Sequence, residues 1–299
     1  MRVPEWGQEA RASKRLSEIP RIHAPSFDTF QREFVDSYQP VIITGAMEDW
    51  KARTEWTVSK FRESIGKQRV RVRNYKHNIG VPRRKWRSFV RFEDRMLEDF
   101  LGLLERDESE GLYLGQISLA HTLPQLLPDI VKPPFLESRN THDVIWIGCG
   151  GHVEPTHFDL PHGVIAQVQG RKEWTVFAPE DKKYLYPFPF WGDVPVWFSR
   201  VDPSAPEPEH QPRAARAKGY TFILNPGEML FSPSGWWHQT RCLDAACISV
   251  THFFEFHKLD HFRKAVRHPW HFGFMARVML QARLQKLRGH AVKRVDYKD

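Results

Sequence analysis

Two histidines and an aspartate have the types and spacing of a metal site. His157 and Asp159 stand two positions apart in the segment Thr-His-Phe-Asp-Leu, and residues two apart on an extended strand point to the same side. His238 follows a Pro-Gly-Glu turn, a Met-Leu-Phe run and the segment Ser-Pro-Ser-Gly-Trp-Trp. Two imidazoles and one carboxylate on one side of a metal leave the opposite positions open, and this arrangement suits the Fe(II) of non-haem oxygenases.

A lysine further along the chain strengthens this interpretation. An H-x-D pair with a distant histidine is weak by itself, because the chain has 15 histidines and a lone histidine is more often a structural group. Lys172 comes fifteen positions after His157, at the start of a strand-like segment. A buried ammonium group there can receive a substrate carboxylate through a charge-assisted hydrogen bond, whereas an isolated lysine on a strand is usually solvated.

The segments around these residues predict a fold made mainly of β-strands. From about Val144 onward, short apolar runs alternate with Gly/Pro turns: VIWIG, GVIAQV, EWTVF, TFIL, EMLF and CISVTHFFEF. Such even spacing is typical of a jelly roll or barrel. The proline-rich segment from Pro187 to Lys218 is expected to be a long loop.

Helices are expected on either side of this β region. Ser26 is a plausible N-cap of a helix that reaches Val35, a strand follows at Pro40–Ile43, and Thr57 caps a second helix that ends at Gly66. The spacing of apolar residues predicts a third helix from Ser88 to about Leu104 and an amphipathic helix beyond Leu259. The apolar face of this last helix consists of Phe274, Val278, Leu280, Leu284 and Leu287.

Basic residues are concentrated in one part of the chain. Lys and Arg number 44 against 36 Asp and Glu, and the stretch from Lys67 to Phe92 has ten basic residues and no acidic one. Arg69, Arg71 and Arg73 alternate with valines, so a strand would place all three on one face. Such a face can attract RNA or an acidic peptide, although a basic run is more often a solvated surface.

Composition excludes several classes of protein. Three cysteines without a C-x-x-C pair indicate neither a disulfide framework nor a thiolate zinc site. No segment reaches the roughly 18 apolar residues that span a membrane, and the first residues lack a signal-peptide core. We therefore expect a cytoplasmic protein without a membrane partner.

Several strings together resemble a known family. They are PVIITGAMEDW, EWTVSKFRESIG, LYLGQ, HVEPTHFDLPHGVIAQVQGRKEWTVFAPED, YLYP and GYTFILNPGEMLFSPSGWWHQT. Over roughly residues 20–256 the chain resembles the JmjC cupin-like hydroxylases, among them the asparaginyl hydroxylase that acts on hypoxia-inducible factor and its bacterial relatives. The resemblance implies a double-stranded β-helix, with an N-terminal α/β elaboration and C-terminal helices.

The resemblance also implies roles for individual residues. Iron(II) would be held by His157, Asp159 and His238, with 2-oxoglutarate and dioxygen as cosubstrates. Lys172 would bind the distal carboxylate of 2-oxoglutarate, and the residues expected to assist it are Tyr113, Thr156 and His252. The tryptophans expected to line a dry substrate pocket are Trp146, Trp174 and Trp236. Two positions depart from the family pattern, since Glu154 replaces a Ser or Thr and Gly163 replaces a frequent Asn.

These features predict hydroxylation of a C–H bond, with a protein or peptide side chain as the leading substrate class. The alternatives are the same chemistry on an RNA nucleoside or a small molecule, a cupin that holds Zn or another metal without redox turnover, and an inactive scaffold. The Arg69/Arg71/Arg73 face, with Arg83, Arg84, Lys85 and Arg87, is expected to border the active-site mouth and recruit an acidic substrate.

We expect four regions: a mobile lead-in over residues 1–20, an N-terminal α/β elaboration over 21–140, a JmjC β core over 141–256 and a helical region over 257–299. The resemblance implies that the helical region forms a homodimer. The alternative is that it only caps the barrel.

Overall fold

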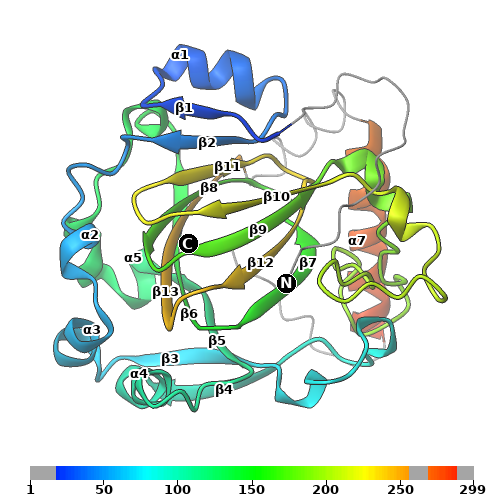
Figure 1. Ribbon diagram of the computed structural model, residues 1–299, viewed down its shortest axis with the longest axis horizontal. Coiled ribbons are helices and arrows are strands. Elements are labelled where there is room, and N and C mark those ends of the chain that lie inside the picture. Colours follow the sequence, from blue (N-terminus) through cyan, green and yellow to red (C-terminus); the bar gives the residue numbers. More distant parts are fainter. Residues whose placement is uncertain (1–17, 256–268, 288–299) are drawn as a thin grey trace.

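Two facing β-sheets form the centre of the computed structural model, which describes residues 18–255 and 269–287 (Figure 1). The larger sheet has nine strands in the order β1-β2-β11-β8-β13-β6-β5-β3-β4, and the smaller has four in the order β10-β9-β12-β7. All strand pairs are antiparallel except β1 with β2. Two such sheets packed face to face are typical of a jelly roll, and the predicted fold class is confirmed.

The strands that the sequence predicts in the β region are all present. The larger sheet consists of β1 (Arg21–His23), β2 (Val41–Thr44), β3 (Arg69–Asn74), β4 (Arg91–Met96), β5 (Leu112–Ser118), β6 (Thr141–Cys149), β8 (His162–Gln169), β11 (Met229–Ser232) and β13 (Ala246–Phe254). The smaller consists of β7 (Val153–Phe158), β9 (Lys172–Phe177), β10 (Gly219–Leu224) and β12 (Trp237–Cys242). The segment between β9 and β10 contains only short 3-10 turns and isolated bridges, as expected for a long loop.

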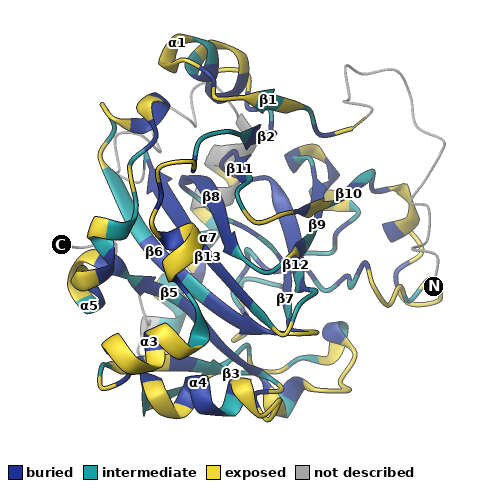
Figure 2. Ribbon diagram, turned by 60° about the vertical axis from the view of Figure 1, so that its left-hand side comes forward, coloured by how far each residue is buried: buried dark blue, intermediate teal, exposed yellow. Residues whose placement is uncertain are grey.

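Short helices cover the outer face of the larger sheet, and their solvent side is exposed (Figure 2). Most of the core lies between these helices and the sheet, where Phe30 packs against Phe231 with ring centroids 5.0 Å apart. Burying one such side chain contributes about 1.5–3 kcal/mol. These short helices are α1 (Phe27–Phe30), α2 (Ala52–Glu55), α3 (Val58–Ile65), α4 (Leu97–Glu105) and α5 (Leu119–Thr122). The longer helix α7 (Pro269–Leu287) lies elsewhere.

The first two predicted helices begin where their caps indicate. The Ser26 hydroxyl accepts a hydrogen bond from the Thr29 amide, and α1 continues into a π-helical turn over Gln31–Val35. The Thr57 hydroxyl accepts from the Lys60 amide at the start of α3. These side chains satisfy amides that the first turn leaves without a partner.

The helix predicted from Ser88 to Leu104 is wrong in its first half. Residues Arg91–Met96 form the edge strand β4, and only Leu97–Glu105 are helical. The strand pairs with β3, where Asp94 accepts from Arg71 and Glu93 from Asn74. This cross-strand pairing outweighs the helical spacing of the apolar residues, and it leaves Phe92 39% exposed.

The C-terminal helix is present as α7, but its predicted apolar face is wrong in part. Leu280 and Leu287 are 42% and 76% exposed, whereas Gln281 is buried. The Gln281 amide donates to the carbonyls of Gly192 and Val194 and accepts from the Val196 amide. A buried loop backbone needs such polar partners. The face of α7 that packs against the loop therefore carries Gln281, whereas the sequence pattern predicted leucine there. Val278 packs against the apolar cluster around Trp237, so α7 covers one end of the barrel.

Some expectations concern residues outside the described parts of the chain. They are most of the lead-in over 1–20, residues 257–268, and residues 288–299. Within residues 18–255 and 269–287, we find no helix with the length and apolar character needed to cross a membrane.

Candidate metal centre and adjoining pocket

Strands β7 and β12 bring the three predicted metal ligands together. His157 lies directly opposite His238 in the register of these strands, and Asp159 follows the end of β7. One ligand atom from each residue lies within 4.8 Å of the other two. Nε2 of His238 is 3.7 Å from Oδ2 of Asp159. Three side chains at these distances can share one metal ion.

Hydrogen bonds orient both imidazoles for a metal. Nδ1 of His157 donates to the Pro155 carbonyl at 2.7 Å, and Nδ1 of His238 donates to the Trp236 carbonyl at 3.1 Å. A proton on Nδ1 leaves the lone pair of Nε2 for the metal, as is usual for metal-binding histidines. Burial and the neighbouring His157 lower the pKa of His238 well below its usual value. The donor set therefore fits a divalent ion such as iron(II).

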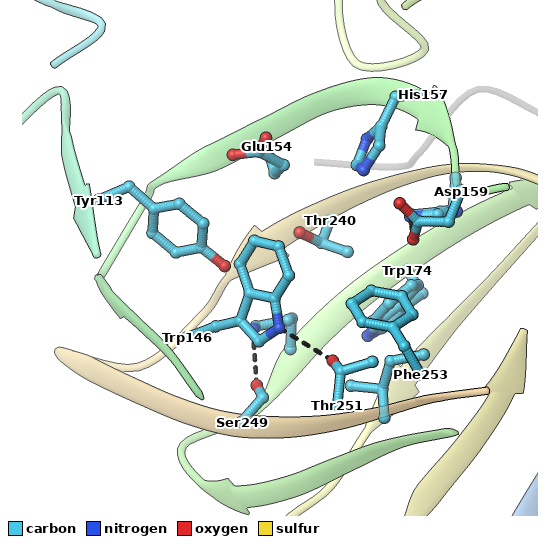
Figure 3. Close-up of a pocket in the computed structure, with 13 residues that line it drawn as sticks. Tyr113, Trp146, Glu154, His157, Asp159, Trp174, Thr240, Ser249, Thr251 and Phe253 are labelled. Atoms are coloured by element: carbon cyan, nitrogen blue, oxygen red, sulfur yellow. Dashed lines mark hydrogen bonds and ion pairs between the residues drawn. The ribbon is translucent and has the colours of Figure 1, made fainter. Parts of the chain in front are cut away.

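A pocket between the two sheets adjoins the ligands (Figure 3). It is open at the metal end, where the Asp159 side chain is 33% exposed, and closed at the other end, where Lys172 is 3% exposed. The side chains that line it besides the three ligands are Tyr113, Trp146, Glu154, Ile165, Lys172, Trp174, Thr240, Ser249, Thr251 and Phe253. Trp146 and Trp174 are therefore placed where the sequence predicts them.

Lys172 supplies a buried positive charge at the closed end of the pocket. Its ammonium group donates to the Ser249 hydroxyl at 2.7 Å, and that hydroxyl donates to Oε1 of the Gln167 side chain at 2.8 Å. Among residues 18–255 and 269–287, no carboxylate forms an ion pair with Lys172. A buried ammonium without a counterion favours binding of an anion, so this end of the pocket fits a carboxylate ligand.

Tyr113 provides a second donor at the closed end. Its ring is stacked against His152 at a centroid distance of 4.1 Å and lies 6.0 Å from Trp146. Burial raises the pKa of the phenol well above its usual value, so the hydroxyl keeps its proton. A neutral tyrosine can donate a hydrogen bond to the carboxylate that Lys172 attracts.

Three predicted pocket residues lie elsewhere. The hydroxyl of Thr156 faces away, toward Gln239 and the Val201 carbonyl. His252 alternates with Thr251 and Phe253 on β13, so it faces the other side of the sheet, where its Nδ1 is 2.9 Å from Asp143. Trp236 is buried in the apolar cluster behind Trp174, and its indole donates to the Tyr38 carbonyl.

Glu154, which departs from the family pattern, points into the pocket. Between His157 and Glu154, three residue steps on β7 match two on β12, so a β-bulge turns both side chains to one side. The carboxylate accepts hydrogen bonds from Arg73 at 3.0 Å and from the Tyr75 hydroxyl at 3.1 Å. Burial alone would raise the pKa of Glu154, but the charge of Arg73 and the nearby His152 imidazole, 3.6 Å away, lower it to about 2. Glu154 is therefore ionised.

The Arg73–Glu154 ion pair should make stability depend on pH. The folded-state pKa lies below the ordinary 4.5, so its contribution is complete above pH 4.5 and is lost as the pH falls toward 2. The comparison is with the Arg73→Met/Glu154→Gln variant, which lacks the pair. We expect the difference in unfolding free energy between wild type and variant to fall by about 3 kcal/mol as the pH drops across this window. Urea denaturation at several pH values measures it. A difference that stays constant would contradict the lowered pKa.

The predicted basic face is only partly exposed to solvent. Arg69 and Arg71 are exposed on one face of β3, but the side chain of Arg73 on the same face is only 12% exposed. Arg83 is 6% exposed, and Arg84 is paired with Glu207. Arg73 and Arg83 are thus not available to recruit a substrate from solution, because both turn inward to buried polar partners.

Arg83 instead connects the two strands that carry the metal ligands. One terminal nitrogen, Nη1, donates to Thr156 at 3.3 Å and to Gln239 at 2.8 Å, and Nη2 is 3.0 Å from Asp202. Thr156 precedes His157 and Gln239 follows His238. The guanidinium therefore fixes the residues next to His157 and His238 and so helps to position both histidine ligands.

We expect Arg83→Met to weaken Mn(II) binding by about 10- to 100-fold, the usual cost of losing a partner that orients metal ligands. Titration of the purified variant gives the dissociation constant, and Arg84→Met is the matched control because Arg84 pairs with Glu207 and not with a neighbour of a metal ligand. Equal affinity in both variants would show that Arg83 has no such role.

Several pocket-lining residues were missed by the sequence interpretation. Ser249, Thr251 and Phe253 line the pocket from alternate positions of β13. The period of two in CISVTHFFEF contains this signal, because it separates these residues from Ile248, Val250 and His252.

Comparison with known proteins agrees with the fold. Residues 27–259 match the cupin-like domain family. The chain belongs to this family and to its JmjC-type proteins, which are Fe(II)- and 2-oxoglutarate-dependent oxygenases.

The similar proteins include lysine-specific demethylase 8 of Danio rerio, to which the chain is 32% identical over 236 residues, covering 76% of this chain and 56% of that protein. It is 28% identical over 245 residues to Jumonji C domain-containing protein 5 of Drosophila melanogaster, covering 80% of this chain and 60% of that protein. It is also 28% identical to human HSPB1-associated protein 1 over 242 residues, covering 75% of this chain and 49% of that protein. The chain spans about half the length of these relatives.

Proposed function

We propose that this protein is a 2-oxoglutarate-dependent hydroxylase that acts on a protein or peptide side chain. The observation that carries the proposal is one pocket with a facial His/Asp/His set at its open end and an unneutralised buried lysine at its closed end. A site for a metal alone would not need a second, buried positive charge at the far end of the pocket.

The residues divide the chemistry between them. With iron(II) bound, 2-oxoglutarate and dioxygen react to give succinate, carbon dioxide and a hydroxyl group in place of a substrate C–H. His157, Asp159 and His238 would hold the metal. Lys172 and Tyr113 would bind the distal carboxylate of 2-oxoglutarate. Trp174, Ile165 and Phe253 exclude water from the space between, which favours the intended C–H bond over side reactions.

The shape of the pocket and the relatives support a protein substrate. The metal end is the open end, so a side chain on a large molecule can approach the metal while the closed end holds the cosubstrate. Two of the similar proteins are named lysine-specific demethylase 8. Arg69 and Arg71, which remain exposed on β3, are the part of the predicted basic face that we still propose for recruiting an acidic segment.

The experiment that tests the substrate class is a search for oxidised products. Protein reconstituted with Fe(II) is incubated with 2-oxoglutarate, air and fractionated lysate, and peptides are examined for an added oxygen atom. We expect modified peptides that require Fe(II), 2-oxoglutarate and an intact Asp159. Products confined to RNA or to small molecules would replace the proposed substrate class, and their absence from every fraction would contradict hydroxylation.

A further inference from the structure

A negative charge lies in the part of the pocket that would receive a carboxylate. Glu154 is on β7 and Lys172 is on β9, the two strands that flank β12. Thr240 pairs with Glu154 on one side and with Trp174 on the other, and Lys172 lies two residues from Trp174 on β9. The side chains of Glu154 and Lys172 both line the pocket. An ionised glutamate in such a buried place opposes the binding of a second carboxylate.

Arg73 is positioned to cancel this charge. Its Nη1 donates to Glu154 at 3.0 Å, and its Nη2 donates to Oε1 of the Gln116 side chain at 3.1 Å. The guanidinium also lies over the Trp146 ring, 5.3 Å from the centroid, where a cation is attracted to the ring face. Arg73 reaches the pocket wall from β3, outside the four-stranded sheet that carries the metal ligands.

The chain provides a dedicated place for this arginine. Strand β5 has an irregularity between Leu114 and Ile117, and Gln116 there adopts a positive φ of 62°, which is uncommon for a residue other than glycine. At Gly115, an added Cβ would lie 3.0 Å from Nε of Arg73 and 3.1 Å from the Trp146 ring. Bulges and strained residues of this kind often aim side chains at functional sites. The Gly-Gln pair after Tyr113-Leu114 thus makes room for Arg73 and binds it.

We propose that Arg73 is a positioning residue for cosubstrate binding, because its charge neutralises Glu154 and allows the closed end of the pocket to accept the carboxylate of 2-oxoglutarate at Lys172. The inference rests on the proposed function. It assigns to Arg73 a role inside the pocket in place of the substrate recruitment that the sequence suggested. A purely structural ion pair would stabilise the fold without affecting the affinity for 2-oxoglutarate.

A double-mutant comparison separates the two roles. The dissociation constant for 2-oxoglutarate is measured by titration of protein loaded with Mn(II), under conditions without turnover. Arg73→Met should raise it by about tenfold or more, since the buried Glu154 is left without its cation. Adding Glu154→Gln to Arg73→Met should restore most of the affinity, because the repelling charge is gone. Arg106→Met, which removes an exposed arginine paired with exposed Glu108 away from the pocket lining, is the matched control and should bind as the wild type does.

Each outcome has a defined meaning. Arg73→Met leaves the buried Glu154 without any partner, so Arg73→Gln is tested beside it. The glutamine keeps hydrogen-bond donors but carries no charge, and this variant should lose as much affinity for 2-oxoglutarate as Arg73→Met. Unchanged affinity in folded Arg73 variants, or no recovery in the double variant, would overturn the inference and leave the proposed function intact. Wild-type protein that binds Mn(II) but no 2-oxoglutarate would overturn both.

Discussion

Asp159→Ala is expected to lower the affinity for Fe(II) or Mn(II) by more than about 100-fold. That figure is the upper cost of losing a residue that only orients a metal ligand, and Asp159 is itself a predicted ligand. The variant loses the only carboxylate in the cluster that holds the metal, and two neutral imidazoles remain. Metal content after dialysis and titration with Mn(II) measure the effect.

The control for this variant is Asp94→Ala, which removes an exposed carboxylate that pairs with Arg71 on the surface. It should bind the metal as the wild type does. Retention of metal by a folded Asp159→Ala protein would mean that the ion is held somewhere other than at the predicted site.

Lys172→Ala is expected to weaken 2-oxoglutarate binding by two to three orders of magnitude while metal affinity changes little. Breaking a buried charge pair costs about 3–5 kcal/mol. Among residues 18–255 and 269–287, the Lys172 ammonium donates to the Ser249 hydroxyl and pairs with no carboxylate, so its charge is left for the ligand. Titration of 2-oxoglutarate into Mn(II)-loaded protein gives the ratio of dissociation constants.

The neighbouring Arg171 supplies a matched control for this variant. It is exposed and forms an ion pair with Asp244 at 2.7 Å, so Arg171→Ala removes a positive charge one residue away without touching the pocket. Similar losses in the two variants would indicate a general effect of net charge, and no loss in Lys172→Ala would mean that another residue binds the cosubstrate.

The parts of the site that the sequence predicts are those that local spacing determines. His157 and Asp159 are two positions apart at the end of a strand, and the apolar runs and turns predict the strands around them. The assignment of the distant His238 rests instead on the resemblance of its segment to the JmjC hydroxylases, and the structure places it opposite His157. The jelly roll follows from the same alternation of runs and turns.

The parts that the sequence could not predict depend on contacts between distant elements. Arg73 and Glu154 form an ion pair although neither segment carries a signal for the other, so the arginine was interpreted as part of an exposed face. The period of two separates Thr251 from His252 on β13, but which of the two faces the pocket depends on the side of the larger sheet that the smaller sheet covers.

The most direct test of the account is the conversion of 2-oxoglutarate to succinate by the wild-type protein in the presence of dioxygen, measured by mass spectrometry with Fe(II) and, separately, with Zn(II). The facial triad and the buried Lys172 predict succinate with Fe(II), none with Zn(II), and none from the Asp159→Ala variant with either metal. If the Fe(II)-loaded wild type binds its metal but forms no more succinate than the Zn(II)-loaded protein, the site is a metal-binding cupin without oxygenase chemistry.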